Sequence, residues 1–438
     1  MSGESAREIG RLAIPTLGAL LVSPTLMLAD SAIIGHWSTD ALAGLGLAQT
    51  ILLTIVGLCI FLAYSTTAST ARALGAGHTA KGIKLGIDAI WLALILGLLA
   101  IAVLVPAGAW LLTLFGADPS VTTEASKYLR VSALGMPAML AVQAATGVIR
   151  GLQDARTPLL IALSAAVLNV PLSILLVFVV GWGIVGAGVG TVICEYLMAS
   201  TLVVIVGRQA VAAKVSLRPE ISGVANAWRD GLPLLVRTIS MRIALILLSV
   251  GVARLGTVQL AAHQVVWNIW GFLVNALDSL AIAAQALTGK YLGRSEVDQL
   301  HAVSAKMARW GVAGGTIAAV VVLGASWVVP TLFSNDVSVQ SAIRVGLFVV
   351  VLCQPLAGYV YVLDGVLMGA GDAWYLAKVA IFNLAIFLPA IWWLVGYGPK
   401  GNLGLACIWL SWGGWFMAAR AVTLWLRYRS DAWVRVGG

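Results

Sequence analysis

Four acidic side chains lie well inside long apolar stretches of the sequence: Asp30, Glu195, Asp278 and Asp364. An ionised side chain near the centre of a bilayer costs about 2.5–3.5 kcal/mol on insertion scales, so each of them needs a partner or a function. A buried carboxyl group can take up a proton, and with further oxygens around it can hold a hard cation such as Na⁺. Both are the chemistry of ion-driven transport.

Asp30 is the best candidate among these acids. It lies about six residues inside the outer end of the first apolar stretch, or roughly 9 Å at 1.5 Å per residue. Ser173 and Thr191 lie about eight residues from the outer end of their stretches, roughly 12 Å deep, and Asn169 is one turn from Ser173 on the same helix face. The sequence predicts that one carboxylate, one amide and two hydroxyls converge on an ion site. The alternative is four unrelated polar residues packed between helices.

The remaining acids are open to two interpretations. Asp278 and Asp364 lie in the cytoplasmic halves of their stretches, and Arg237 and Arg242 could pair with them there. Burying an ion pair costs less than burying either charge alone. A structural pairing and a place in the substrate pathway both remain open for these two acids, and Glu195 is equally unassigned.

Two prolines, Pro15 and Pro24, interrupt the first apolar stretch. A proline in a helix interior removes a backbone hydrogen bond and bends the helix. Pro15 therefore predicts a helix that can bend when Asp30 changes its charge. A bend without functional motion is the alternative.

The second half of the chain repeats the first at one offset. Pro233 follows Pro15 by 218 residues, and Pro355 follows Pro137 by the same number. A register that survives over turn and kink residues indicates a duplicated unit, and in a membrane protein two similar halves favour a transporter. The four positions that correspond to the candidate ion site are apolar in the second half: Leu248, Phe387, Ile391 and Trp409.

The composition is that of a membrane protein. Of the 438 residues, 60% are hydrophobic and 10% charged, and the mean hydropathy is +0.97. About twelve apolar stretches approach the roughly 20 residues that a spanning helix needs. They are 11–35, 43–74, 85–115, 127–150, 157–181, 184–207, 230–254, 260–289, 309–333, 341–369, 375–397 and 401–426. We predict an all-α membrane protein with about twelve transmembrane helices in two pseudo-symmetric six-helix bundles. Its expected parts are an N-terminal lobe at 1–207, a cytoplasmic linker at 208–229 and a C-terminal lobe at 230–438.

The net charge of +9 does not indicate nucleic-acid binding, because the basic residues are distributed by loop. Lys and Arg gather in alternate loops, whereas intervening loops carry Asp118, Glu124 and Asp336. This asymmetry predicts a multi-pass protein of the cytoplasmic membrane, with both termini and the 208–229 linker in the cytoplasm. We expect small organic molecules and membrane lipid as its partners, and a monomeric protein.

No sequence pattern indicates an enzyme or a cofactor. The four cysteines lie singly in apolar stretches without metal or redox spacing, and the four histidines form no His-x-x-x-His pair. Neither a Gly-x-Ser-x-Gly motif nor a phosphate loop is present. We therefore expect no catalytic residue, no metal and no cofactor apart from a coupling ion.

Five segments give the chain a resemblance to a known family: Leu28–Gly35, Gly147–Asp154, Leu260–Gln264, Ala276–Gln285 and Leu363–Asp372. With them it resembles the multidrug and toxic compound extrusion (MATE) transporters, in the branch of DNA-damage-inducible protein F. The resemblance covers essentially the whole chain. It implies twelve helices in two six-helix lobes and ion-driven efflux of organic, often cationic or amphipathic, compounds.

The resemblance also implies roles for single residues. Asp30 matches the helix-one acid of the family's ion site, Asn169 and Thr191 match two of its polar partners, and Pro15 matches its bending proline. Many relatives carry a second acid one turn after the helix-five asparagine, where this chain has Ser173. The resemblance therefore favours a single titrating acid at Asp30.

We expect a secondary active antiporter that exports organic compounds, driven by a proton gradient acting through Asp30. Burial favours the neutral form of a carboxyl group, which suits proton uptake from a more acidic exterior. Sodium coupling is an alternative, since Asp30, Asn169, Ser173 and Thr191 could together supply four oxygens. A flippase for lipid-linked sugars is another, but it should have a strongly cationic cavity for pyrophosphate.

Overall fold

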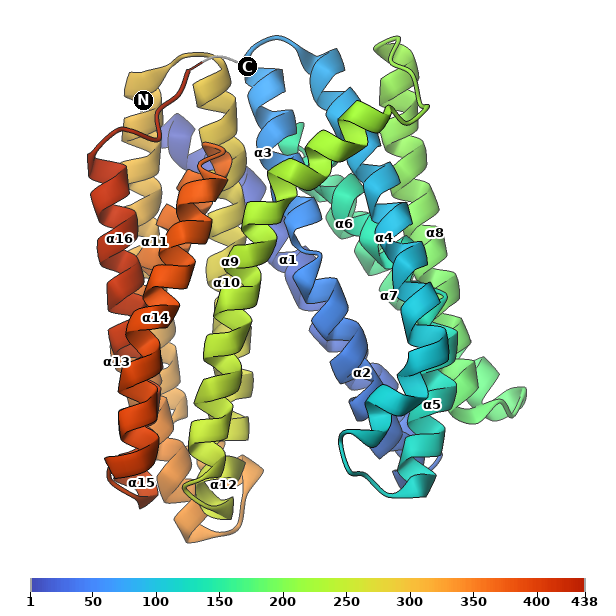
Figure 1. The fold of residues 1–438 in the computed structure, drawn as a ribbon, viewed down its shortest axis with the longest axis vertical. Helices are drawn as coiled ribbons and strands as arrows, with labels where there is room; N and C mark the ends of the chain where they lie inside the picture. Colours follow the sequence, from blue (N-terminus) through green and yellow to red (C-terminus); the bar gives the residue numbers. More distant parts are fainter. Residues whose placement is uncertain (1, 437–438) are drawn as a thin grey trace. The chain divides into compact units, whose positions relative to one another are not determined.

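The computed structural model describes residues 2–436, with side chains from residue 6 onward. In this part of the chain the regular structure is helical and contains no strand, as Figure 1 shows. The prediction of an all-α protein is confirmed. In chain order the α-helices are α1 (Ser2–Gly35), α2 (Thr39–Leu58), α3 (Phe61–Gly75), α4 (Thr79–Thr113), α5 (Pro119–Ala133), α6 (Met136–Gly151), α7 (Arg156–Ile174), α8 (Gly183–Ala212), α9 (Ile221–Ala253), α10 (Thr257–Gly293), α11 (Val297–Ala325), α12 (Val329–Phe333), α13 (Val337–Gly369), α14 (Ala373–Tyr397), α15 (Gly401–Leu410) and α16 (Met417–Arg429). Two π-helical turns are η1 (Leu175–Val179), which continues α7, and η2 (Ser411–Phe416), which joins α15 to α16.

The number of spanning helices agrees with the prediction. Among the described residues, eleven helical spans are long and apolar enough to cross a membrane, and α5 with α6 makes a twelfth if the bent pair is one span. The bend between α5 and α6 is 51°. Pro137 in the first turn of α6 explains the break, because proline has no backbone N–H to bond back into α5. The stretch 127–150, expected as one spanning helix, is therefore broken.

The described chain forms two compact units, and helices α1 and α9 each contribute to both. Within the described residues the N-lobe consists of 14–232, and the C-lobe consists of 233–436 together with 2–13. Helix α1 thus changes lobe next to Pro15, and α9 changes lobe at Pro233, the repeat counterpart of Pro15.

Each crossing segment is held by side chains of the lobe that it joins. In the C-lobe, Glu8 near the start of α1 pairs with Lys290 and accepts a hydrogen bond from the Tyr291 hydroxyl at 2.7 Å. In the N-lobe, the ring of Trp228 on α9 packs edge-on against Phe61, with the ring centroids 6.0 Å apart. The two lobes have therefore exchanged the first segments of corresponding helices.

A short loop joins α8 to α9 and is fixed to α4. It covers 213–220, because the ends of α8 and α9 occupy the rest of the 208–229 stretch expected as a linker. Lys84 of α4 pairs with Glu220 at 3.2 Å and with Asp88 at 3.1 Å, and Asp88 accepts a hydrogen bond from the Glu220 backbone N–H at 3.2 Å. These bonds attach the loop to the N-lobe.

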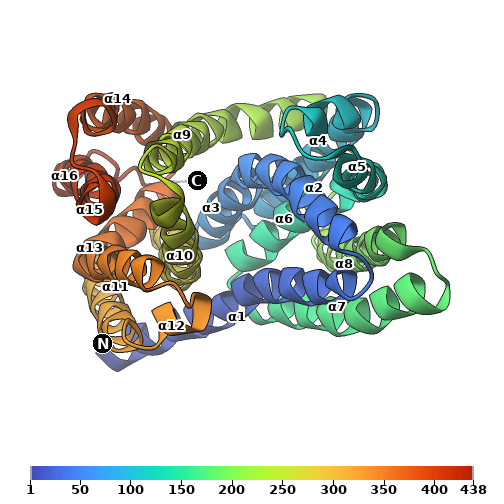
Figure 2. The same cartoon turned by 90° about the horizontal axis from the view of Figure 1, so that it is seen from below.

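The duplication is visible in the helix packing within each lobe. In the N-lobe α6 packs against α3, and Gly147 lies so close to the Ala63 carbonyl that a side chain would have no room. In the C-lobe α13 packs against α10, and Gly365 lies against the Ala281 carbonyl in the same way. Gly365 and Ala281 follow Gly147 and Ala63 by 218 residues, the offset of the repeat. Figure 2 shows α3 beside α6 and α10 beside α13.

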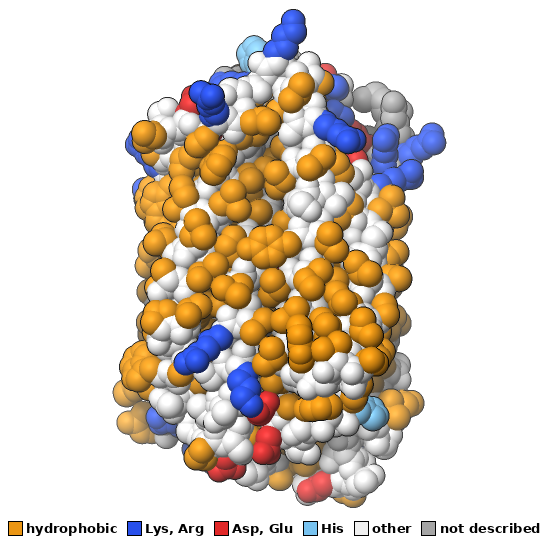
Figure 3. All heavy atoms as spheres, turned by 90° about the vertical axis from the view of Figure 1, so that its right-hand side faces the viewer, with side chains coloured by type: hydrophobic (Ala, Val, Ile, Leu, Met, Phe, Trp, Pro, Cys, Tyr) orange, Lys and Arg blue, Asp and Glu red, His pale blue; other side chains and the backbone are white. Residues whose placement is uncertain are grey.

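The outer surface is that of a membrane protein. Figure 3 shows one face on which apolar side chains cover the middle and charged side chains lie toward the two ends. Large apolar residues of several spans are exposed, among them Leu98, Val167 and Ile317. A belt of this kind is what the hydrocarbon core of a bilayer covers.

Candidate functional site

The N-lobe brings the predicted polar set together from three helices. The Thr191 hydroxyl on α8 donates a hydrogen bond to Oδ2 of Asp30 on α1 at 3.5 Å, and the Asn169 amide on α7 donates to the Thr191 hydroxyl oxygen at 3.4 Å. Asp30, Asn169 and Ser173 are all buried, with Asp30 only 5% exposed. Asp30, Thr191 and Asn169 therefore do meet, whereas Ser173 forms no hydrogen bond with them. The role of the four residues as an ion site stays a prediction.

Three oxygens of this polar set have no hydrogen-bond partner. They are Oδ1 of Asp30, Oδ1 of Asn169 and Oγ of Ser173, each on a buried side chain. A buried polar atom left without a partner costs about 1–3 kcal/mol. The site therefore has the acceptor capacity for a proton or for a small hard cation.

The local structure explains how α7 and α8 approach each other here. A Cβ at Gly190 would lie 3.0 Å from the Ser173 hydroxyl, so the glycine lets α8 come close to α7. Pro171 removes one backbone hydrogen bond from α7 just before the π-helical turn η1. Such turns occur frequently at functional sites.

Sequence reasoning missed one residue of this site, Tyr128 on α5. Its side chain is buried, and its hydroxyl lies beside Gln49, Ser132 and Thr191, within electrostatic reach of Asp30. The sequence held little signal for it, because the expected helix 127–150 began there.

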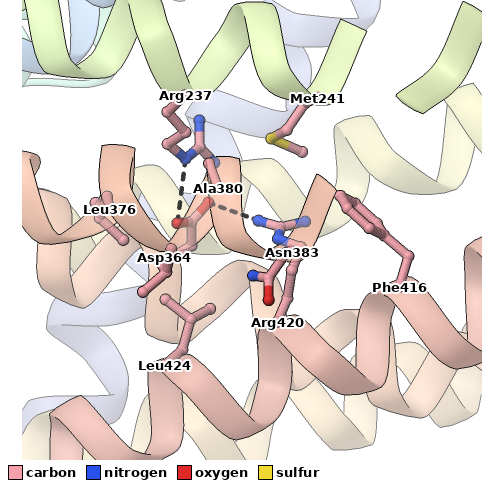
Figure 4. A pocket seen from close by; sticks show the side chains of 10 residues that line it. Arg237, Met241, Asp364, Leu376, Ala380, Asn383, Phe416, Arg420 and Leu424 are labelled. Carbon is pink, nitrogen blue, oxygen red and sulfur yellow. Dashed lines mark hydrogen bonds and ion pairs between the residues drawn. The ribbon is translucent and has the colours of Figure 1, made fainter. Parts of the chain in front are cut away.

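The C-lobe holds a different cluster around Asp364 on α13. Arg237 of α9 donates from Nε to Oδ1 of Asp364 at 3.3 Å and also contacts Oδ2 through Nη2. Arg420 of α16 donates from Nη2 to Oδ2 of Asp364 at 3.0 Å. Figure 4 shows the carboxylate between the two guanidinium groups, in a small pocket that Asn383 and Phe416 also line.

This cluster favours the structural interpretation of Asp364. Pairing with Arg237 is one of the two partnerships that the sequence left open, whereas Arg420 was not foreseen. Asp278 of α10 lies near the same charges, since Asp278, Arg237 and Arg420 are all within electrostatic reach of the Tyr361 side chain. Glu195 belongs to neither group: it lies on α8 in the N-lobe, one turn from Thr191.

The bending role of Pro15 stays a prediction. Helix α1 is continuous from Ser2 to Gly35 and contains both Pro15 and Pro24. The boundary between the lobes falls at Ala13–Ile14, next to Pro15.

Comparison with known protein families matches two stretches of this chain, residues 15–175 and 233–393, to MatE. Together the stretches cover more than half of the chain, and at both ends they are offset by 218 residues, as the repeat is. The chain belongs to the MatE family. Members of the MATE family are multidrug and toxin efflux transporters in membranes and are not enzymes.

Several curated proteins are similar along the chain. Protein DETOXIFICATION 43 of Arabidopsis thaliana is 34% identical over 342 residues, which cover 76% of this chain but only 62% of that protein. DNA damage-inducible protein F of Escherichia coli (strain K12) is 30% identical over 442 residues, which cover 94% of this chain and 95% of that protein. A probable multidrug resistance protein NorM of Thermotoga maritima is 23% identical and covers 92% of this chain and 88% of its own.

Solved structures show the same fold. A MOP superfamily transporter from Pyrococcus furiosus has a TM-score of 0.88 at 22% identity, covering 99% of this chain and 97% of its own. Structures of MATE in the bent and in the straight conformation have TM-scores of 0.88 and 0.87, each at 22% identity over 98% of this chain. These likenesses confirm the predicted arrangement of two six-helix lobes. The protein is a multi-pass membrane transporter of the MATE family.

Proposed function

We propose that this MATE transporter is a secondary active antiporter that exports organic, often cationic or amphipathic, compounds in exchange for protons taken up by Asp30. One observation carries the proposal. The buried Asp30 carboxylate accepts a hydroxyl hydrogen bond at Oδ2, while its Oδ1 has no partner. No ion pair of Asp30 with Lys or Arg forms in the part of the chain that the structure describes.

The arrangement indicates where the proton binds. The Thr191 hydroxyl can donate to Oδ2 whether Asp30 is ionised or neutral, so Oδ1 is the atom left to carry the proton. Burial without a basic partner penalises the ionised form. Asp30 therefore ionises when the lobe is open to water of lower proton concentration and takes up a proton from the more acidic side.

Proton uptake can be coupled to export through charge. Ionised Asp30 attracts a cationic compound to the N-lobe, whereas neutral Asp30 does not, so protonation lowers the affinity for the compound. A ligand shifts a conformational equilibrium only by its difference in affinity for the two states, and the charge of Asp30 supplies that difference. Asp30 lies on α1, which belongs to both lobes, and Pro15 weakens that helix beside the lobe boundary.

Sodium coupling is the second candidate, and the unpaired oxygens favour it. Asp30, Asn169 and Ser173 each leave one buried acceptor oxygen without a partner. A hard cation prefers several such oxygens, but this polar set offers only one negative charge. A proton needs a single oxygen, and for that reason we favour protons.

A flippase for lipid-linked sugars is not supported by the C-lobe. Pyrophosphate would need basic side chains available to bind it. The two buried guanidinium groups of the cluster, on Arg237 and Arg420, already bind Asp364.

Transport by purified protein in vesicles tests the coupling ion. Ethidium export is measured first with a pH gradient in sodium-free buffer and then with a sodium gradient at symmetric pH. Export with the first gradient alone, lost in Asp30→Asn and kept in the loop variant Asp118→Asn, is the expected result. Export with the sodium gradient alone would replace protons by sodium in the proposal.

The location in the cytoplasmic membrane and the orientation belong to the same proposal. The basic loops support a cytoplasmic position for both termini and for the 213–220 loop. A Lys214→Cys variant should be protected from an impermeant thiol reagent in whole cells and react after the cells are opened. Labelling in whole cells would show that the 213–220 loop lies outside the cell, which is the opposite orientation.

A further inference from the structure

Glu195 occupies the middle of the interior face of α8. Residues three or four apart share one face of a helix, and the stripe through Glu195 contains Gly188, Thr191, Ala199 and Leu202. Gly188, Ala199 and Leu202 are buried, and Thr191 binds Asp30. Glu195 therefore points into the N-lobe, toward its interior.

Two different layers flank Glu195 along this stripe. One turn away, about 6 Å along the helix, Thr191 binds Asp30. One turn in the other direction, Ala199 packs in an apolar cluster with Ala138 and Ala141 of α6. Glu195 is thus an acid inside the N-lobe, one helical turn from the residue that binds Asp30. Its side chain is partly exposed, whereas that of Asp30 is buried.

Glu195 has no counter-charge. Among the described residues its carboxylate forms no hydrogen bond and no ion pair with Lys, Arg or His. The basic groups on helices packed against α8 are engaged elsewhere, exposed or near helix ends. They are Lys84, paired with Asp88, and the exposed Lys81 on α4, Lys127, paired with Glu124, and the exposed Arg130 on α5, Arg150 at the end of α6 and Arg156 at the start of α7. Cys194, the neighbouring residue, lies within electrostatic reach of both Glu195 and Asp30.

We infer that Glu195 is a second proton-binding carboxylate of the N-lobe, so that each export cycle exchanges two protons rather than one. This inference rests on the proposed proton coupling through Asp30. An acid without a base in a membrane lobe must lose its charge whenever water leaves it, and a proton is the smallest group that can neutralise it.

The limiting ethidium gradient depends on the number of protons exchanged for each ethidium, so it can be used to determine that number. Ethidium is allowed to reach its limiting gradient in vesicles that hold a pH gradient at zero membrane potential. If two protons exchange for one ethidium, an about tenfold proton gradient balances an about hundredfold ethidium gradient, because each proton contributes one factor of ten. If one proton exchanges, the ethidium gradient is about tenfold.

Wild type should reach the larger gradient, and Glu195→Gln should reach only the smaller one. Glu195→Asp, which keeps the carboxylate, and the loop variant Asp118→Asn should behave like wild type. The inference is wrong if Glu195→Gln keeps the larger gradient and merely reaches it more slowly, as a proton relay would. A smaller gradient in the wild type also overturns it, even if the variant does not fold. A wild type that responds to no pH gradient contradicts the proposed function instead.

Discussion

Asp30 and Asp364 are both buried acids in spanning helices, yet their surroundings are opposite. In the N-lobe, Asp30 has a hydroxyl and an amide nearby, and one of its oxygens has no partner. In the C-lobe, Asp364 has two guanidinium groups on its two oxygens. Burial alone therefore does not make an acid functional in such a protein. The presence or absence of a counter-charge decides whether it can change its charge during transport.

The two lobes diverged at these positions after duplication. The repeat counterpart of Asp30 is Leu248, and that of Asp364 is Thr146. Arg420, which binds Asp364, corresponds to Leu202 in the N-lobe. Each lobe thus has one polar centre whose counterpart residues are apolar or uncharged in the other, on a framework common to both.

The largest effect should come from Asp30→Asn. Ethidium export driven by a pH gradient should fall to background, because the amide cannot carry the exchanged proton. The variant should fold at least as well as wild type, since it removes an unpaired buried charge. Export and thermal unfolding in detergent are measured together, and wild-type export from well-folded variant protein would remove Asp30 from the mechanism.

Asp364→Ala should behave in the opposite way and reduce stability. It leaves the guanidinium groups of Arg237 and Arg420 without their carboxylate, and breaking a buried pair costs about 3–5 kcal/mol. The control is another acid of the C-lobe, Asp336, which caps α13 by accepting a hydrogen bond from the Ser338 backbone N–H at 2.7 Å. Asp336→Ala should cost only about 1 kcal/mol. Equal unfolding temperatures for the two variants would show that the cluster is not structural.

Ser173→Ala should have a smaller effect and sharpen the choice of ion. The buried Ser173 oxygen has no partner, so removing it should change stability little. Under proton coupling at Asp30, export in a pH gradient should stay close to wild type. Under sodium coupling, the loss of one oxygen ligand should raise the sodium concentration needed for half-maximal export. Export by Ser173→Ala and by wild type, measured against the sodium concentration, decides between the two ions.

The smallest effect is expected at an ion pair that water reaches. Lys84 pairs with Glu220, whose side chain is 61% exposed. Glu220→Gln should lower the free energy of unfolding by less than about 1 kcal/mol, and less still at high salt. A loss as large as that of Asp364→Ala would mean that the 213–220 loop supports the N-lobe far more strongly than its exposure indicates.

The sequence was informative about depth and less informative about neighbours across a lobe. Counting residues from the outer ends of the helices placed Asp30 and Thr191 at similar depths and Asn169 one turn further in, and the structure joins the three by hydrogen bonds. Arg420 was missed because it lies 56 positions from Asp364, on a helix whose rotation the sequence does not determine. Tyr128 was missed because it lies at the start of the expected helix 127–150, which the structure divides into α5 and α6.

The exchanged segments of α1 and α9 have a consequence for how the chain is made. Residues 6–13 are synthesised before the N-lobe, but their binding partners Lys290 and Tyr291 are synthesised after it. The N-lobe in turn is complete only when residues 221–232 have followed the loop. A chain cut within 213–220 would give two fragments that each hold a helical segment of the other, as in a swapped dimer. Each lobe therefore receives one of its helical segments from the other half of the chain, so the two halves complete each other only within the whole polypeptide.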